Sequence, residues 1–304
     1  MKTSLHILKG MLFLGIILQL TCCKKTNWDE NFREKEKSPF GTYIVYNEAD
    51  KLFKEQEIVY LKENFYDYIY DANDNATDQL FNYICIKSNA SKLTEDGVNT
   101  LLSEVWEGNN AFLALNYFSD ELREQLGFKT NNLDKEVFGV ENLKALKGEF
   151  YLENASFENQ PYTFDRNIRR NYVVTYNENT TIVLGTTKID GEKVPNFIKV
   201  YHGKGAIYLH TNPIIFTNYY LLKDKEKYVE NIFSYLPENT VYWDSQIKSS
   251  KYADDSDKDN TSIFKFFLQH KTLTWFLYVS FGVFCYLCCS MRAENNAQFP
   301  LSIP

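Results

Sequence analysis

A histidine stands where catalytic groups are common in α/β proteins. His210 ends a short apolar run that begins at residue 205. Open α/β sheets bind ligands and place chemistry at the carboxyl ends of their strands. A histidine base in this position would be suited to activate Cys85 or Ser119 as a nucleophile. One hypothesis is therefore a hydrolase or amidotransferase-like enzyme that uses His210 with Cys85 or Ser119.

The segments around these two nucleophiles favour structural roles for both. A nucleophile elbow places a Ser or Cys between glycines on the turn after a central strand. The turn after the apolar run 111–115 has no such glycines. Ser119 precedes a short helical pattern and is a good N-cap, and Cys85 lies within the apolar run 81–86, where a small buried side chain is typical. We expect no catalytic residues and no enzyme activity.

Metal and cofactor motifs are missing from the sequence. His202 and His210 are too far apart for a local His pair, and neither a P-loop nor a Gly-x-Gly-x-x-Gly motif occurs. Three further cysteines lie within an uncharged apolar segment, where we expect them to be packing residues: Cys285, Cys288 and Cys289. We predict no metal site and no cofactor.

Polar residues gather at the ends of the two strands predicted at 111–115 and 205–210. They are Asn116, Tyr117, His210, Asn212 and Asn218. Asparagine side chains hydrogen-bond the backbone of the loops that they shape, so a structural role is the first interpretation. The same edge is the usual crevice for a ligand or a partner peptide. We therefore name these five residues as the candidate ligand or partner edge.

The elements that position this edge follow an α/β order. The clearest unit is a strand at 81–86, a helix ended by Gly108 and a buried strand at 111–115. The helix carries four apolar residues at helical spacing: Val98, Leu101, Leu102 and Val105. We also predict a helix from Ser38-Pro39 to about Lys54, a helix that carries Tyr228 to Leu236, and strands at 57–61 and 240–244.

Residues 129–200 follow a different pattern, in which alternating apolar and polar residues indicate antiparallel strands. The predicted fold is an α/β domain with an open, mostly parallel sheet flanked by helices and with a β-rich insertion at about 129–200.

Two apolar segments bracket this domain. Residues 1–23 form a signal-like leader or an N-terminal anchor, and an uncharged segment at 272–290 has about the 20 residues that a membrane helix needs. Between them we expect an extracytoplasmic domain at 24–247, a polar linker at 248–262 and a membrane-proximal segment from 263. A short cytoplasmic tail, 291–304, follows the membrane helix, which runs to residue 290.

Cys23 is a candidate lipidation residue, because Leu20 to Cys23 loosely resembles a bacterial lipoprotein cleavage box. An uncleaved anchor is the alternative. Either form places the main domain in the periplasm at the bacterial inner membrane. The net charge of −7, without a large basic surplus, argues against nucleic acid as a partner.

Several longer segments carry a family resemblance. They are "KSPFGTYIVYNEADKLF", "FNYICI" leading to "EVWEGNNAFLALNYFS", "GKGAIYLHTNPIIFTNYYLLK" and "YVENIFSYLPENTVYW". In this order the chain, over about 28–290, resembles the bacterial family called domain of unknown function 4350. The resemblance implies a membrane-bound domain with a class I glutamine amidotransferase-like (flavodoxin-like) fold that lacks the catalytic Cys elbow. Asn116 stands about where that Cys would be.

The resemblance also implies a role in an envelope assembly, with other membrane proteins such as transport or ATPase components as partners. Our leading hypothesis is a membrane-tethered, non-catalytic binding or scaffolding module. A sensor that binds a small envelope metabolite at the edge formed by Asn116 and His210 is the third hypothesis, beside the enzyme.

Overall fold

A computed structural model describes residues 26–71, 79–89, 95–132, 140–154, 156–157 and 161–245. The chain divides into two compact units, Met1–Lys248 and Ser249–Pro304, and all described residues belong to the first. The predicted leader with Cys23, the linker, the membrane helix at 272–290 and the tail lie outside the described residues. Among the described residues, no helix is long and apolar enough to cross a membrane.

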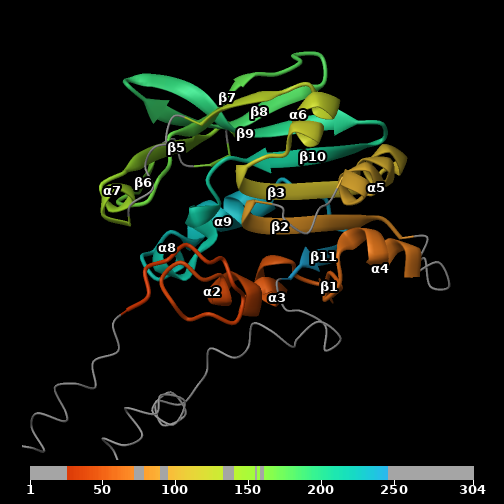
Figure 1. The fold of residues 1–304 in the computed structure, drawn as a ribbon, viewed down its shortest axis with the longest axis horizontal. Coiled ribbons are helices and arrows are strands. Elements are labelled where there is room, and N and C mark those ends of the chain that lie inside the picture. Colours follow the sequence, from red (N-terminus) through yellow and green to blue (C-terminus); the bar gives the residue numbers. More distant parts are fainter. Residues whose placement is uncertain are drawn as a thin grey trace, which may run out of the picture. The chain divides into compact units, whose positions relative to one another are not determined.

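A nine-stranded sheet forms the centre of the domain, in the order β1-β11-β2-β3-β10-β9-β8-β5-β6 (Figure 1). Its first five strands are parallel to one another. They are β1 (Ile58–Leu61), β11 (Thr240–Asp244), β2 (Phe81–Asn89), β3 (Asn110–Tyr117) and β10 (Gly205–His210). The chain therefore forms an α/β domain with parallel strands in one half of a large sheet, in agreement with the predicted class.

Most strands of the predicted insertion extend the same sheet with antiparallel pairing (Figure 1, green). These are β5 (Gly148–Leu152), β6 (Tyr162–Phe164), β8 (Thr181–Ile189) and β9 (Glu192–His202). Two other strands of this region, β4 (Lys129–Asn132) and β7 (Asn171–Thr175), pair in a small second sheet.

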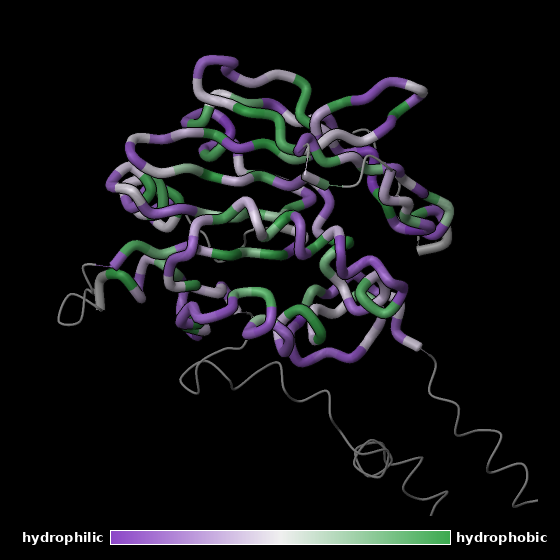
Figure 2. The backbone as a smooth tube through the Cα atoms, turned by 180° about the vertical axis from the view of Figure 1, so that it is seen from behind, coloured by the Kyte–Doolittle hydropathy of each residue, from purple (hydrophilic) through white to green (hydrophobic). Residues whose placement is uncertain are grey.

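Each face of the large sheet is covered by its own apolar core. One core contains residues of α2 (Tyr43–Asn47), α3 (Ala49–Leu52), η3 (Pro213–Phe216), α8 (Asn218–Leu221) and α9 (Glu226–Phe233). The other contains residues of α4 (Phe65–Asp71), α5 (Glu95–Glu107), α6 (Asp120–Leu126) and the small sheet. β3 and β10 are buried along almost their whole length, which is typical of parallel strands covered on both faces. Apolar residues are frequent in the central strands (Figure 2).

Most local predictions are confirmed. The predicted β2–α5–β3 unit is present, with the four aliphatic residues of α5 buried. Ser119 caps α6, since its Oγ accepts a hydrogen bond from the Leu122 amide at 3.3 Å. A further short helix, α7 (Val140–Lys144), lies in the insertion.

Two predicted helices have different bounds in the structure. The chain is not helical from Pro39, because the backbone of residues 36–41 is hydrogen-bonded to α8 instead: Tyr219 N–H donates to the Pro39 carbonyl at 2.7 Å and Asn218 N–H to Gly41 at 2.9 Å. The helix that was expected to reach Leu236 ends at Phe233.

Candidate functional site

The predicted edge lies at a topological switch point of the sheet. β3 and β10 are neighbours, with His210 opposite Ala114. After β3 the chain continues into α6, which packs on one face, whereas after β10 it continues into η3, which packs on the other face. Connections that diverge in this way create a crevice at the carboxyl ends of the two strands. Asn116 and His210 both lie at these strand ends, and both are buried.

His210 is fully buried in a ring of aromatic side chains. Phe150, Phe197, Phe216 and Tyr228 have ring centroids 5.5–6.3 Å from its imidazole. Its Nδ1 accepts a hydrogen bond from the Asn212 backbone amide at 3.1 Å. This fixes the neutral tautomer with the proton on Nε2, which lies 3.2 Å from the Tyr228 hydroxyl. Burial lowers the pKa of His210 to about 3, so the ring is uncharged at neutral pH.

Asn171, the first residue of β7, fills the crevice between the ends of β3 and β10. Its side-chain amide donates to the Asn116 carbonyl at 3.0 Å. Its own carbonyl accepts from the Thr211 hydroxyl at 2.7 Å and from the Asn212 side-chain amide at 3.4 Å. All four residues are at least 97% buried. The sequence did not single out Asn171, because nothing in its local pattern shows that it meets strands at such distant positions.

Asn218 does not reach this crevice and instead ties the N-terminal segment to α8. Its Oδ1 accepts from the Ile44 amide at 2.8 Å, and its Nδ2 donates to the carbonyls of Glu36 and Ser38 at 2.9 and 2.8 Å. Of the predicted edge residues, only Tyr117 is partly exposed. The structure thus brings Asn116, His210 and Asn212 together and places Asn218 elsewhere.

Cys85 and His210 do not meet. Cys85 belongs to the core on the α5 face, whereas the aromatic neighbours of His210 belong to the opposite core, and β3 separates their strands. Burial raises the pKa of the Cys85 thiol well above its usual range. Ser119 uses its hydroxyl as the α6 cap. Neither residue is therefore arranged as a nucleophile for His210 in this structure.

A buried charge pair lies at the carboxyl ends of β2 and β11, which the sequence interpretation missed. The Lys87 ammonium is paired with the Asp244 carboxylate, and the two side chains are each 2% exposed. The Tyr83 hydroxyl donates to the same carboxylate at 2.9 Å. Burial by itself would lower the pKa of Lys87, but the paired Asp244 carboxylate outweighs this effect and the pKa is raised. The sequence signal that could have revealed this pair is a charged residue directly after each apolar run.

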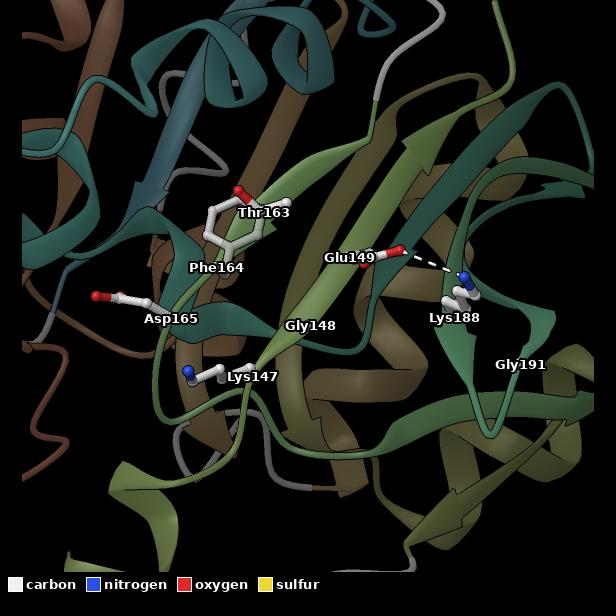
Figure 3. A pocket seen from close by; sticks show the side chains of 8 residues that line it. All are labelled: Lys147, Gly148, Glu149, Thr163, Phe164, Asp165, Lys188 and Gly191. Atoms are coloured by element: carbon white, nitrogen blue, oxygen red, sulfur yellow. Dashed lines mark ion pairs between the residues drawn. The ribbon is translucent and has the colours of Figure 1, made fainter.

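A cavity of about 480 Å³ lies on the antiparallel half of the sheet, away from these residues (Figure 3). It is lined by strands β5 and β6 and by the β8–β9 hairpin, with Glu149 and Lys188 facing each other at 3.8 Å. None of the predicted edge residues lines it. Within the described part of the chain, no cluster of three or more His, Cys, Asp or Glu residues could hold a metal ion.

No protein-family model matches the chain, and no curated protein sequence matches it. Among solved structures, an exo-beta-1,4-mannosidase, Op5Man5 from Opitutaceae bacterium strain TAV5, is 14% identical over 46% of this chain and 22% of its own, with a TM-score of 0.31. A beta-galactosidase from Bacillus circulans sp. alkalophilus is 13% identical over 57% and 22%, with a TM-score of 0.28. Gan42B, a GH42 beta-galactosidase, is 13% identical over 66% and 27%, with a TM-score of 0.34.

This chain spans about a quarter of the length of these glycosidases or less. At such TM-scores the likeness supports no conclusion about fold family or activity.

Proposed function

We propose that this chain is a membrane-tethered, non-catalytic binding or scaffolding module of the bacterial envelope. Its α/β domain would belong to the class I glutamine amidotransferase-like, flavodoxin-like type that the resemblance to the domain of unknown function 4350 family implies. The apolar segments at 10–23 and 272–290 support the tether. The domain would face the periplasm, in a lipid-anchored form if Cys23 is modified.

The observation that carries the non-catalytic role is how the polar side chains at the switch point are used. His210 is neutral, packed in aromatic rings and bonded to the Asn212 amide, and Asn171 hydrogen-bonds both Asn116 and Asn212. These groups hold three distant segments together at the place where α/β proteins usually bind ligands. We expect a protein partner to bind over this edge, where Tyr117 is partly exposed, with other envelope membrane proteins as the expected class.

Labelling from the periplasmic side tests the location of the domain. Leu222 is 75% exposed, whereas Cys85 is fully buried, so a Leu222→Cys variant adds one accessible thiol to the described region. A membrane-impermeant maleimide should label this variant more strongly than the wild-type chain in intact spheroplasts. If the extra labelling occurs only after lysis, the domain lies in the cytoplasm and the proposal is wrong.

Crosslinking tests the scaffolding role. The full-length chain should capture a defined set of membrane proteins from native membranes, identified by mass spectrometry. A matched chain that lacks residues 262–304 should capture fewer of them. Identical sets from both chains would contradict an assembly role that depends on the tether.

A sensor of a small envelope metabolite remains the second candidate, because the candidate edge lies at a switch point. A compound that stabilises the full-length chain against heat, and does not stabilise an Asn116→Ala variant, would favour this function. If the compound also fails to stabilise a variant with an unrelated surface change, such as Glu107→Gln, the result would speak against binding at this edge.

A further inference from the structure

The first described segment is bound to the domain as a strap, which we define as residues 28–42. Its Trp28 ring lies 4.0 Å from the Arg166 guanidinium, a cation–π contact. The same ring packs edge-on against Phe40 and Tyr219, with centroids 5.8 Å apart in each pair. Trp28 therefore joins the strap to α8 and to the loop that follows β6.

A second contact fixes the strap to the same loop. The two carboxylate oxygens of Glu30 accept hydrogen bonds from Asn167 Nδ2 and Arg169 Nη2, each at 2.9 Å. The side chains of Arg169 and Glu30 are only 13% and 10% exposed. A charge-assisted pair that is shielded from water in this way is stronger than an exposed surface pair.

The clamped loop leads directly to the residue that fills the switch-point crevice. Arg169 is two positions before Asn171, whose side chain and carbonyl bind Asn116, Thr211 and Asn212. Contacts therefore run without a gap from the strap, through residues 166–170, to the crevice between β3 and β10. Other contacts also hold the loop. The amides of Asn167 and Ile168 donate to carbonyls of residues 143 and 146, the Arg166 amide donates to the Tyr220 hydroxyl, and the Arg170 guanidinium is paired with Asp190.

We propose that the strap is a lock on the switch-point crevice. While Trp28 and Glu30 hold residues 166–169, Asn171 stays in place and occupies the polar groups at the ends of β3 and β10. Release of the strap removes the Trp28 and Glu30 contacts of this loop. Withdrawal of Asn171 from its place beside β4 then exposes the Asn116 carbonyl, the Thr211 hydroxyl and the Asn212 amide to a protein partner. This inference rests on the proposed binding role of the edge and adds a control of its accessibility from the N-terminal side of the domain.

Hydrogen exchange of the full-length chain in detergent, followed by mass spectrometry, tests the lock. A Trp28→Ala, Glu30→Gln double variant removes both contacts, and Glu107→Gln, which alters an exposed pair with Lys204, is the matched control. In the double variant we expect exchange at least about tenfold faster in peptides that cover 114–118 and 208–213, with α5 unchanged. The control should match the wild type in all of these peptides.

Faster exchange confined to the strap and to residues 161–170, with 208–213 unchanged, would overturn the proposal, because the other contacts of residues 166–171 would then hold Asn171 without the strap. If exchange also accelerates in α5, the double change has destabilised the whole domain. In that case the milder Glu30→Gln variant is measured instead, and faster exchange in the same two peptides, 114–118 and 208–213, with α5 unchanged, supports the lock. Since exchange reports the opening without any partner or membrane, failure of the lock is distinguishable from failure of the periplasmic or scaffolding role.

Discussion

At the scale of single residues, the ends of the parallel strands carry polar groups that are buried and internally paired. His210 is uncharged in a ring of aromatic side chains, and the positive charge of Lys87 is balanced by the Asp244 carboxylate. Buried groups of this kind cost free energy unless every partner is present. Their substitution is therefore expected to change stability in ways that differ between the two sites.

The protonation of His210 should make stability fall in mild acid. Its pKa is about 3 in the folded domain and 6.5 when exposed, so below pH 6.5 the unfolded chain takes up a proton that the folded chain does not. This proton uptake lowers the free energy of unfolding by about 1.4 kcal/mol between about pH 7.5 and about pH 5.5. Urea titrations of a His210→Gln variant should show a smaller loss of the free energy of unfolding over this pH range than those of the wild type.

His202 provides the control for this measurement. Burial also lowers the pKa of His202, but that side chain is only partly buried. A His202→Gln variant should therefore keep most of the wild-type pH dependence. Equal slopes for the wild type and His210→Gln would show that His210 is accessible to protons in the folded domain.

Removal of the Lys87 ammonium should be strongly destabilising. A Lys87→Met variant leaves the Asp244 carboxylate buried without its cation, which typically costs about 3–5 kcal/mol. The double variant Lys87→Met, Asp244→Asn should recover part of this loss, because it removes the charge and keeps an acceptor for Tyr83. The exposed pair of Lys204 and Glu107 is the control, and Lys204→Met should cost less than about 1 kcal/mol. Urea unfolding of the four chains measures the difference.

At the scale of elements, helix α5 and the β9–β10 hairpin are fitted closely together. The Lys204 amide donates to the Trp106 carbonyl at 2.9 Å, and the Trp106 indole meets the His202 ring edge-on at 5.3 Å. Gly203 lies at the tip with a φ of +60°, directly against Trp106. The hairpin can approach the helix in this way only because position 203 has no Cβ.

A pair of glycine substitutions separates backbone strain from this packing. Gly191, in the β8–β9 hairpin, also has a positive φ of +93°, but a Cβ there would meet no atom within 4 Å. Gly191→Ala should thus cost only the strain of the left-handed backbone, about 1–2 kcal/mol. Gly203→Ala should cost about 1–3 kcal/mol more, because Trp106 must also shift. Similar midpoints of thermal unfolding for both variants would mean that α5 and the hairpin are not tightly packed.

At the scale of the whole molecule, the last strand of the domain lies inside the sheet. β11 hydrogen-bonds to β1 on one side and to β2 on the other, although about 150 residues or more separate it from both. Strand pairing over such a separation is slow and cannot begin before the segment exists. The parallel half is therefore incomplete until the chain has been made to residue 244.

Truncation before and after β11 tests this dependence. A chain that ends at Ser249 retains β11 and should keep the trypsin-resistant core of the full-length chain. A chain that ends at Asn239 loses β11, exposes the edges of β1 and β2, and should be degraded at least about tenfold faster. Equal resistance of the two chains would show that β11 contributes little to the stability of the domain.

The sequence by itself determined the features that depend on neighbouring residues. Apolar spacing defined α5 and β3, Ser119 and Gly127 bounded α6, and the position of His210 marked a strand end. Each of these signals is a periodicity or a cap within one or two turns of chain, so it can be read without knowledge of the fold.

Tertiary structure alone decided what depends on distant segments. It placed β11 between β1 and β2, put Cys85 and His210 on opposite faces, and brought Asn171 into the crevice. It also replaced the helix predicted from Pro39 by hydrogen bonds to α8, since these satisfy the backbone equally well and allow the strap to pack. Strand order, the face that a residue occupies and the burial of a charge follow from contacts between segments about 40 to 180 residues apart, which no local pattern encodes.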